Sequence, residues 1–295
     1  MSSGAEITFS APPQVLVRNQ GAMSITLSAW TGWDPMNRYF LPALCVVSIF
    51  NAGSALAQDR RPGIIGEDNR VIVVDKGRPW DAIGQVNIGG YRMSGQCTGT
   101  LVAPKLVITA AHCVMDPWKK TSFLLPNIYF LAGVRGAEHK GQASAKCLRF
   151  LEGYEYIPPE KILPTMLAQK SPMRAFLKDV VAIGLDQSLA VDPAPLAEGV
   201  VPQPGLRLVH AAYPRDHRFM LWAHFNCQLL RSDVEHPFWI NDCDTQPGSS
   251  GGPLFVKTDG VLRLAAIMLA GSTQRYNVAL PISEWIDLTR SSECP

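Results

Sequence analysis

Three residues that together could perform nucleophilic catalysis occur in this sequence in the order histidine, aspartate, serine. His112 follows the run LVITAA, Asp179 begins DVVAIGLD, and Ser250 lies in DCDTQPGSSGGPLF. A serine hydroxyl becomes a nucleophile when a base removes its proton; histidine is the usual base, and an aspartate can orient it. PGSSGGP also has the composition of a flexible linker, so the rest of the chain has to distinguish a linker from a rigid reactive turn.

The order of the three residues argues against two other arrangements of the same chemistry. The string GSSGG from Gly248 to Gly252 satisfies G-x-S-x-G, the nucleophile elbow of α/β-hydrolases, but that fold needs its histidine after the serine. All six histidines precede Ser250, at positions 112, 139, 210, 217, 224 and 236. The subtilisin order needs an aspartate before the histidine, and nothing upstream of His112 resembles that family's aspartate strand.

The sequence around these residues resembles the chymotrypsin family of serine proteases. TAAHC, which ends at Cys113, is similar to the family's histidine motif, and GQCTGTLVAPKL upstream is similar to its approach to that histidine. The strand beginning at Asp179 resembles the family's strand that begins with Asp, with Val181 where Ala is commoner. The segment GSSGGP resembles the family's serine motif, Gly-Asp-Ser-Gly-Gly-Pro. The resemblance covers about residues 64–288 and points to the secreted bacterial branch that includes the glutamyl endopeptidases. Three motifs in this order favour the interpretation of PGSSGGP as a rigid reactive turn over that of a flexible linker.

The resemblance implies a serine endopeptidase that cleaves protein or peptide substrates through an acyl-enzyme intermediate, with no cofactor and no metal. His112 would be the general base, Asp179 would orient it, and Ser250 would be the nucleophile. The backbone N–H groups of Gly248 and Ser250 would form the oxyanion hole. The rival hypothesis is a catalytically silent homologue that binds a protein or peptide in the same cleft, and the presence of all three residues argues against it.

The residue preference at the cleaved bond would depend on a pocket beside Ser250. Asp244 stands where trypsin-like members keep the carboxylate that binds Arg or Lys. Thr245 fits the threonine of glutamyl-specific members, but Met268 takes the place of their histidine, which disfavours acidic residues. The segment from Leu269 to Gly271 is expected to line the pocket and to pair with substrate backbone. Basic residues and small or apolar residues therefore both remain open.

Short strands are the elements expected to position these residues. The 295 residues are 47% hydrophobic and 18% charged, which is typical of a globular protein with a sizeable core. A net charge of +2, without basic runs interleaved with aromatics, argues against nucleic acid as a partner. Short β-rich runs separated by Gly, Pro, Asn or Asp predict an all-β protein. Those runs lie at residues 70–75, 82–89, 105–111, 128–134, 179–185, 206–214 and 262–269.

The family resemblance implies that these runs form two six-stranded antiparallel β-barrels, followed by a short C-terminal helix. A peptidase domain is expected over residues 64–290, with barrel one at about 64–185 and barrel two at about 206–282. Residues 186–205, rich in Pro and small side chains, read as the linker between them. Residues 283–290 are predicted to be the terminal helix, with Trp285, Ile286 and Leu288 on one apolar face.

The first 57 residues are predicted to be an N-terminal extension and a secretory signal peptide, with the signal at 36–57. Arg38 supplies the positive start, residues 40–50 supply the apolar run, and the small residues ending at Ala57 supply a cleavage signature. A buried core helix is the alternative. Residues 58–63 would be a short pro-segment or the mature N-terminus. We expect a secreted or periplasmic monomer without a stable membrane anchor, because the apolar run is short and contains a proline.

Signal removal would leave six cysteines, an even number that suits disulfides in an oxidising compartment. Six cysteines allow 15 pairings, so their number alone does not fix the connectivity. The sequence has no CxxC pair and no HExxH motif to support a zinc site. The resemblance implies the pair Cys97–Cys113, a loop ahead of the serine turn is expected to be closed by Cys227–Cys243, and Cys147–Cys294 is left by elimination.

Overall fold

The structure, a computed structural model, describes residues 61–89, 95–157, 178–232, 237–271, 275–291 and 294. These residues fall within one unit of the chain, Leu56–Pro295. The predicted extension and signal peptide, and residues 58–60 of the segment after them, lie outside the described residues. No helix in the described ranges has the length and apolar character needed to cross a membrane.

Six antiparallel strands close the first barrel in the order β2-β3-β4-β7-β6-β5. Alternation directs one face of each strand inward: in β5, Ile128, Phe130 and Ala132 are buried, whereas Tyr129 and Leu131 are only partly buried. The strands are β2 (Ile83–Ile88), β3 (Gly95–Ala103), β4 (Leu106–Thr109), β5 (Ile128–Ala132), β6 (Gly141–Phe150) and β7 (Val181–Leu185).

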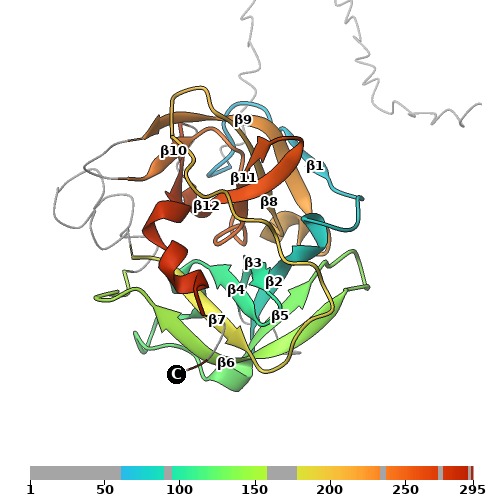
Figure 1. The fold of residues 1–295 in the computed structure, drawn as a ribbon, viewed down its shortest axis with the longest axis vertical. Helices are drawn as coiled ribbons and strands as arrows, with labels where there is room; N and C mark the ends of the chain where they lie inside the picture. The colour runs from blue at the N-terminus through green and yellow to red at the C-terminus, as the bar shows by residue number, and fades with distance from the viewer. Residues whose placement is uncertain are drawn as a thin grey trace, which may run out of the picture. The chain divides into compact units, whose positions relative to one another are not determined.

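The second barrel closes in the order β8-β9-β10-β13-β12-β11, because β11 pairs with β8. Its strands are β8 (Arg207–Ala212), β9 (Trp222–Ser232), β10 (Trp239–Asn241), β11 (Pro253–Thr258), β12 (Val261–Gly271) and β13 (Asn277–Pro281). In Figure 1 this barrel, in orange and red, lies above the green and yellow first barrel. The predicted architecture of two six-stranded antiparallel barrels is confirmed.

The beginning of the domain differs from the prediction. Barrel one was expected to start near residue 64, but β1 (Arg70–Ile72) pairs with β9 at the edge of the second barrel. The Arg70 guanidinium holds it there, because its Nη2 lies 2.8 Å from Asp68 Oδ2 and 2.7 Å from Asp216 Oδ2. Strand β1 therefore belongs with the barrel that carries Ser250.

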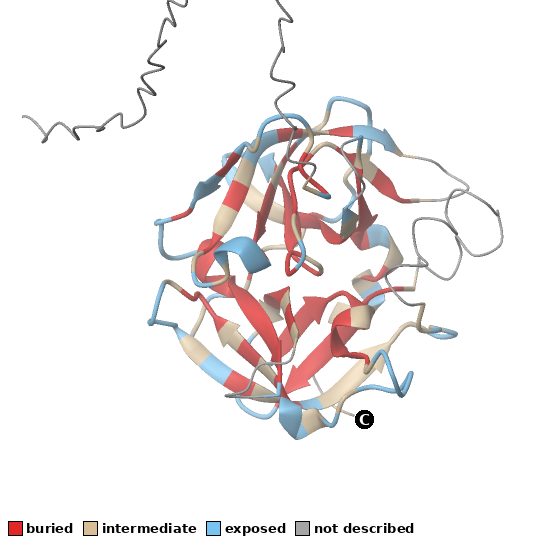
Figure 2. Ribbon diagram, turned by 180° about the vertical axis from the view of Figure 1, so that it is seen from behind, coloured by how far each residue is buried: buried red, intermediate tan, exposed pale blue. Residues whose placement is uncertain are grey.

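Buried residues concentrate in the strands of both barrels, while exposed residues lie mainly in the connecting loops (Figure 2). The segment between β7 and β8, which contains the predicted linker, contacts both barrels: the Ala194 N–H donates to the Leu101 carbonyl at 2.9 Å, and the Ala197 N–H donates to the Leu264 carbonyl at 2.9 Å. The buried Tyr213 of the second barrel also reaches the first, where its hydroxyl lies 3.3 Å from the Ile83 carbonyl. These contacts fix the two barrels against each other.

The C-terminal segment forms two 3₁₀ turns in place of the predicted helix over 283–290. The turns flank Trp285, whose φ of −139° lies outside the helical region and interrupts the helix. Trp285 is fully buried, and its indole N–H donates to the Leu280 carbonyl at 3.2 Å. The 3₁₀ turns of the described chain are η1 (Trp80–Ala82), η2 (Ala111–Val114), η3 (Leu125–Asn127), η4 (Arg215–His217), η5 (Ile282–Glu284) and η6 (Ile286–Thr289).

Three disulfides connect the described elements, and they are the same three pairs that the sequence led us to expect. One joins β3 to η2, one joins β6 to the C-terminal segment, and one joins β9 to the loop that precedes Ser250. The pairs are Cys97–Cys113, Cys147–Cys294 and Cys227–Cys243.

Candidate active site

His112 and Asp179 meet because their strands are neighbours. β4 and β7 are antiparallel partners, with Thr109 opposite Val181, so the end of β4 lies beside the start of β7. His112 follows β4 and Asp179 precedes β7. The His112 Nδ1 lies 2.7 Å from Asp179 Oδ2, and the His112 backbone N–H donates to Asp179 Oδ1 at 2.9 Å. Both carboxylate oxygens therefore fix the orientation of one histidine.

The electrostatics of this pair favour a proton on His112. Burial alone would lower the pKa of His112, but the negative charge of Asp179 and its hydrogen bond outweigh burial and raise the pKa above its usual value. The hydrogen bond at Nδ1 leaves Nε2 as the nitrogen that can accept a proton from another group. This arrangement suits a general base whose protonated form is stabilised.

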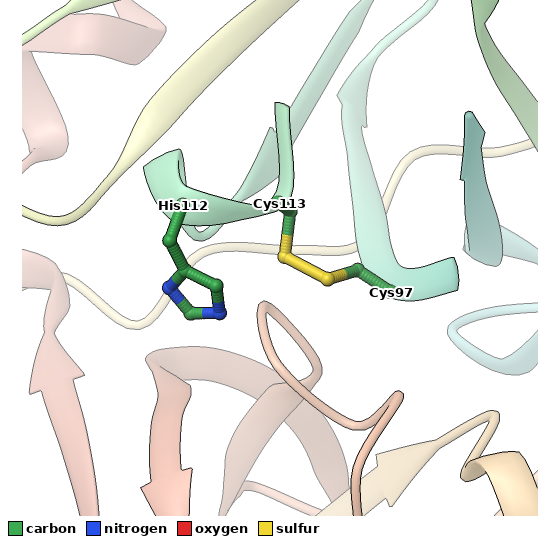
Figure 3. Close-up of side chains that lie close together, drawn as sticks. All are labelled: Cys97, His112 and Cys113. Atoms are coloured by element: carbon green, nitrogen blue, oxygen red, sulfur yellow. A yellow bond between two sulfur atoms is a disulfide. The ribbon is translucent and has the colours of Figure 1, made fainter. Parts of the chain in front are cut away.

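The Cys97–Cys113 disulfide braces the turn that carries the histidine. Figure 3 shows the His112 ring beside this disulfide, which ties η2 to the strand that bears Cys97. The two sulfurs and one ring nitrogen of His112 lie close enough for a metal site, but sulfurs bonded to each other are not thiolate ligands. The bridge therefore has a structural role at this position.

Ser250 lies in a turn between β10 and β11 that a strand of the first barrel holds in place. The Thr98 N–H of β3 donates to the Ser250 carbonyl at 2.9 Å, and the Thr98 hydroxyl donates to the Gly248 carbonyl at 2.9 Å. The Thr98 hydroxyl in turn accepts the Tyr213 N–H at 2.9 Å. Within the turn, the Ser249 N–H donates to the Gln246 carbonyl at 2.9 Å. The stretch PGSSGGP is thus a hydrogen-bonded turn with contacts to both barrels.

The glycines of this turn occupy positions where a side chain would collide with backbone. Gly248 has a φ of +98°, and a Cβ there would lie 2.9 Å from Arg215 N and from Tyr213 O. A Cβ at Gly251 would lie 2.4 Å from the Thr98 carbonyl oxygen. Within the described chain, the N–H groups of Gly248 and Ser250 donate no backbone hydrogen bond, so both remain available as donors.

A cleft of about 350 Å³ brings the candidate residues of the two barrels together. His112, from the first barrel, and Ser250, from the second, both line it, and Gly248 lies in the same wall. Four residues predicted to form a pocket also line it: Thr245, Met268, Leu269 and Gly271. The geometry supports attack by a serine hydroxyl on a bound acyl group, with a histidine base on one side and backbone donors on the other.

Asp244 is the exception among the predicted pocket residues, and the structure corrects its interpretation. Asp244 is not among the described residues that line the cleft, and it is fully buried. Its Oδ1 accepts the Ile65 N–H at 2.8 Å, and its Oδ2 accepts the Asn69 N–H at 2.8 Å. Burial would raise the pKa of Asp244, but the nearby His224 ring and the hydrogen bonds from the N–H groups of Ile65 and Asn69 outweigh it and lower the pKa. The carboxylate anchors the N-terminal segment of the domain.

Several residues of the site escape sequence reasoning. Thr98, which clamps the serine turn, lies 150 residues away from Gly248 in the chain. Pro62 and Arg215 line the cleft from the N-terminal segment and from η4. Thr98 lies within the quoted stretch GQCTGTLVAPKL, but nothing in that stretch indicates its contact with the serine turn, because only the packing of the two barrels brings these residues to the site.

Two of the solved structures that share this fold are proteases. A Glu endopeptidase determined in complex with MPD is 20% identical, with a TM-score of 0.58, over 77% of this chain and 99% of that one. The VesB protease of Vibrio cholerae is 19% identical, with a TM-score of 0.56, over 75% of this chain and 66% of that one. At these identities the likeness concerns the fold.

Relatives found by sequence comparison are serine proteases. Human serine protease 23 is 27% identical over 224 residues, which make up 70% of this chain and 54% of that protein, so the chain spans about half the relative's length. The CLIP domain-containing serine protease B15 of Anopheles gambiae is 35% identical over 89 residues, 29% of this chain and 23% of that protein. Residues 97–263 match the trypsin-like peptidase domain, and the chain belongs to that family.

Proposed function

We propose that this protein is a serine endopeptidase that hydrolyses peptide bonds through an acyl-enzyme intermediate. The observation that carries the proposal is the hydrogen bond between His112 Nδ1 and Asp179 Oδ2, 2.7 Å long, at a cleft that Ser250 also lines. Membership of the trypsin-like peptidase family supports the same reaction. Protein or peptide chains are the proposed substrates, and this chain's own residues supply every group that the reaction needs.

In the first half of the reaction, neutral His112 takes the proton of the Ser250 hydroxyl through Nε2 while the serine oxygen attacks the carbonyl carbon of the substrate. Asp179 keeps the other nitrogen protonated and stabilises the imidazolium that forms. The negative charge that develops on the carbonyl oxygen is bound by the N–H groups of Gly248 and Ser250. The imidazolium then gives its proton to the amine nitrogen of the substrate, and the C–N bond breaks. The amine departs, and the acyl group remains attached to Ser250 as an ester.

The second half repeats these steps with water as the nucleophile. His112 removes a proton from water, and the hydroxide attacks the ester carbonyl while the same two N–H groups bind the oxyanion. The tetrahedral intermediate collapses, the new carboxylic acid leaves, and the proton returns from His112 to Ser250. The enzyme is regenerated with no net change in its protonation.

The three disulfides support a location outside the cytoplasm, since such bonds persist in oxidising compartments. We propose export as a secreted or periplasmic protein after cleavage near Ala57. Expression of the full chain in a secreting bacterial host, followed by N-terminal sequencing of the exported protein, tests this. A first residue at or after Gln58 is expected, and an intact N-terminus would contradict it.

Labelling with a fluorophosphonate probe tests the proposed function, because the probe phosphonylates serines that a neighbouring base has activated. Purified, oxidised protein should be labelled at Ser250, as located by peptide mapping, and Ser250→Ala should abolish labelling. Ser188→Ala, the same change at an exposed linker serine, is the matched control and should be labelled like the wild type. Absence of labelling in the folded wild type would contradict the proposal and favour a catalytically silent homologue.

A further inference from the structure

The residues that line the pocket beside Ser250 would determine which substrate side chain fits next to the cleaved bond. No Asp or Glu is among the described residues that line the cleft. A pocket for Lys or Arg needs a carboxylate, because a buried cation without a partner costs several kcal/mol. Arg215 also lines the cleft, but it is an exposed residue, so solvent screens its charge and it offers a substrate ion no buried partner.

Asp244 cannot supply the missing carboxylate. Its oxygens are occupied by the N–H groups of Ile65 and Asn69, each at 2.8 Å, and the His224 Nδ1 lies 3.3 Å from Oδ2. A substrate cation could reach this carboxylate only by displacing the N-terminal segment of the domain. Asp244 is therefore a positioning residue for the pocket wall.

The wall that Asp244 positions is built partly from the N-terminal segment itself. The Gly63 carbonyl accepts the Thr245 N–H at 3.0 Å and the Asn277 side-chain N–H at 2.8 Å. The Gln246 side chain donates to the Pro62 carbonyl at 2.7 Å, and Pro62 lines the cleft. A Cβ at Gly63 would lie 2.5 Å from the Thr245 carbonyl oxygen, so the segment packs closely against the wall.

Thr245 presents its methyl group to this wall, because its hydroxyl is bound elsewhere. The Thr245 Oγ1 lies 3.3 Å from the Nε2 of His210, whose Nδ1 lies 3.1 Å from the Pro253 carbonyl oxygen. A carbonyl only accepts, so Nδ1 carries the proton and Nε2 accepts the Thr245 hydroxyl. A Cβ at Gly271 would lie 3.0 Å from the Thr245 Cγ2, which places this methyl at the pocket wall.

His210 supplies no positive charge for an acidic substrate. It is 2% exposed, and burial lowers its pKa to about 4, so the imidazole is neutral near pH 7. Of the groups that face it, His224 and Arg70 lower its pKa further, while the hydrogen bond from Nδ1 to the Pro253 carbonyl and the Asp244 carboxylate raise it, and burial outweighs both. The histidine holds the Thr245 hydroxyl and is turned away from the cleft.

We propose that the pocket beside Ser250 takes an uncharged, small or apolar side chain on the acyl side of the cleaved bond, with Asp244 and His210 as positioning residues of its wall. This inference rests on the proposed function and names its substrate class. The wall consists of the Thr245 methyl, Pro62, Met268, Leu269, Ala270 and Gly271. Burial of an apolar side chain against these groups is favourable, at about 25 cal/mol per Å² removed from water.

A panel of fluorogenic peptides that differ only at the residue before the cleaved bond tests the inference. Peptides with Ala, Val, Leu or Met at that position should give values of kcat/KM at least about 100-fold above those with Lys, Arg, Asp or Glu, because the pocket offers an ion no partner. A preference for Lys or Arg, or for Asp or Glu, would overturn the inference. Fluorophosphonate labelling of the same sample separates the two claims: labelled protein with a charged preference contradicts only the inference.

The variant Asp244→Asn distinguishes positioning from substrate binding. The rank order of the peptide panel should be unchanged, and the melting temperature should fall, because the N-terminal segment loses a charged acceptor. Asp192→Asn, at an exposed linker position, is the matched control and should match the wild type in both measurements. A selective loss of Lys or Arg cleavage in Asp244→Asn would overturn the inference, and the wild-type panel decides it if that variant does not fold.

Discussion

The two barrels hold their functional residues by different means. In the first barrel, strand register places His112 beside Asp179, and the two oxygens of one carboxylate fix the histidine. In the second barrel, the serine turn and the pocket wall depend on distant segments. Thr98 clamps the turn from the other barrel, and Ile65 and Asn69 bind Asp244 across 179 and 175 residues.

Because the two regions are held in place differently, substitutions in them should affect different properties of the protein. A change at the histidine pair should alter the rate of reaction and its pH dependence while the choice of substrate stays the same. A change behind the pocket wall should alter stability while the ranking of substrates and the basicity of His112 stay the same. The serine turn joins both regions, because its backbone carries the N–H groups proposed to bind the oxyanion and also packs against Thr98.

The largest effect short of removing the nucleophile or its base is expected at Asp179. Asp179→Asn keeps the size of the side chain but removes the charge that fixes the His112 tautomer, so kcat/KM should fall about 10⁴-fold. Steady-state kinetics on a cleaved peptide measure this, with Asp192→Asn as the control for a neutralised but exposed aspartate. The ranking of substrates should not change, and a changed ranking would break the division between the two barrels.

A loss of about 10²- to 10³-fold in kcat is expected for Gly248→Ala. The new Cβ would lie 2.9 Å from two backbone atoms at a φ of +98°, so the N–H that would bind the oxyanion must move. Gly205→Ala is the matched control, because Gly205 has a φ of +85° with nothing within 4 Å of the added Cβ. A similar loss in both variants would mean that backbone strain alone is responsible.

The pH profile of kcat/KM should follow His112, with a loss of about a hundredfold two pH units below its pKa. The imidazolium cannot accept a proton, so activity falls as pH falls through the pKa of His112. Asp179 raises that pKa, and the decline should begin above the ordinary value of about 6.5. In Asp179→Asn the residual activity should decline at a lower pH, because the charge that raises the pKa is gone. A decline that stays at the same pH would contradict the assigned pair.

The smallest effect is expected behind the pocket wall. Thr245→Val keeps the shape and the methyl group but leaves His210 Nε2 without a donor, so the free energy of unfolding should fall by about 1–3 kcal/mol. Urea unfolding at pH 7 measures this, with Thr258→Val, at an exposed position of β11, as the control. The substrate preference should stay apolar. An unchanged stability would show that the hydroxyl is not engaged by His210.

The sequence predicts the first region better than the second, for a physical reason. The motifs at His112, Asp179 and Ser250 record local strand and turn geometry, and the resemblance they carry implies both the two barrels and the Cys97–Cys113 bridge. The direction of the Asp244 carboxylate depends on backbone N–H groups far away in the chain, which leave no local signal. The same holds for β1, which joins the second barrel through the ion pair of Arg70 with Asp216.

The most direct test of the central claim is whether Ser250 and His112 act as one unit. The measurement is kcat/KM for Ser250→Ala, His112→Ala and the double variant, on a peptide that the wild type cleaves. If the histidine acts only by activating the serine, each single variant should lose about as much as the double variant, on the order of 10⁶-fold. Losses that multiply in the double variant, or substantial activity in either single variant, would contradict the account.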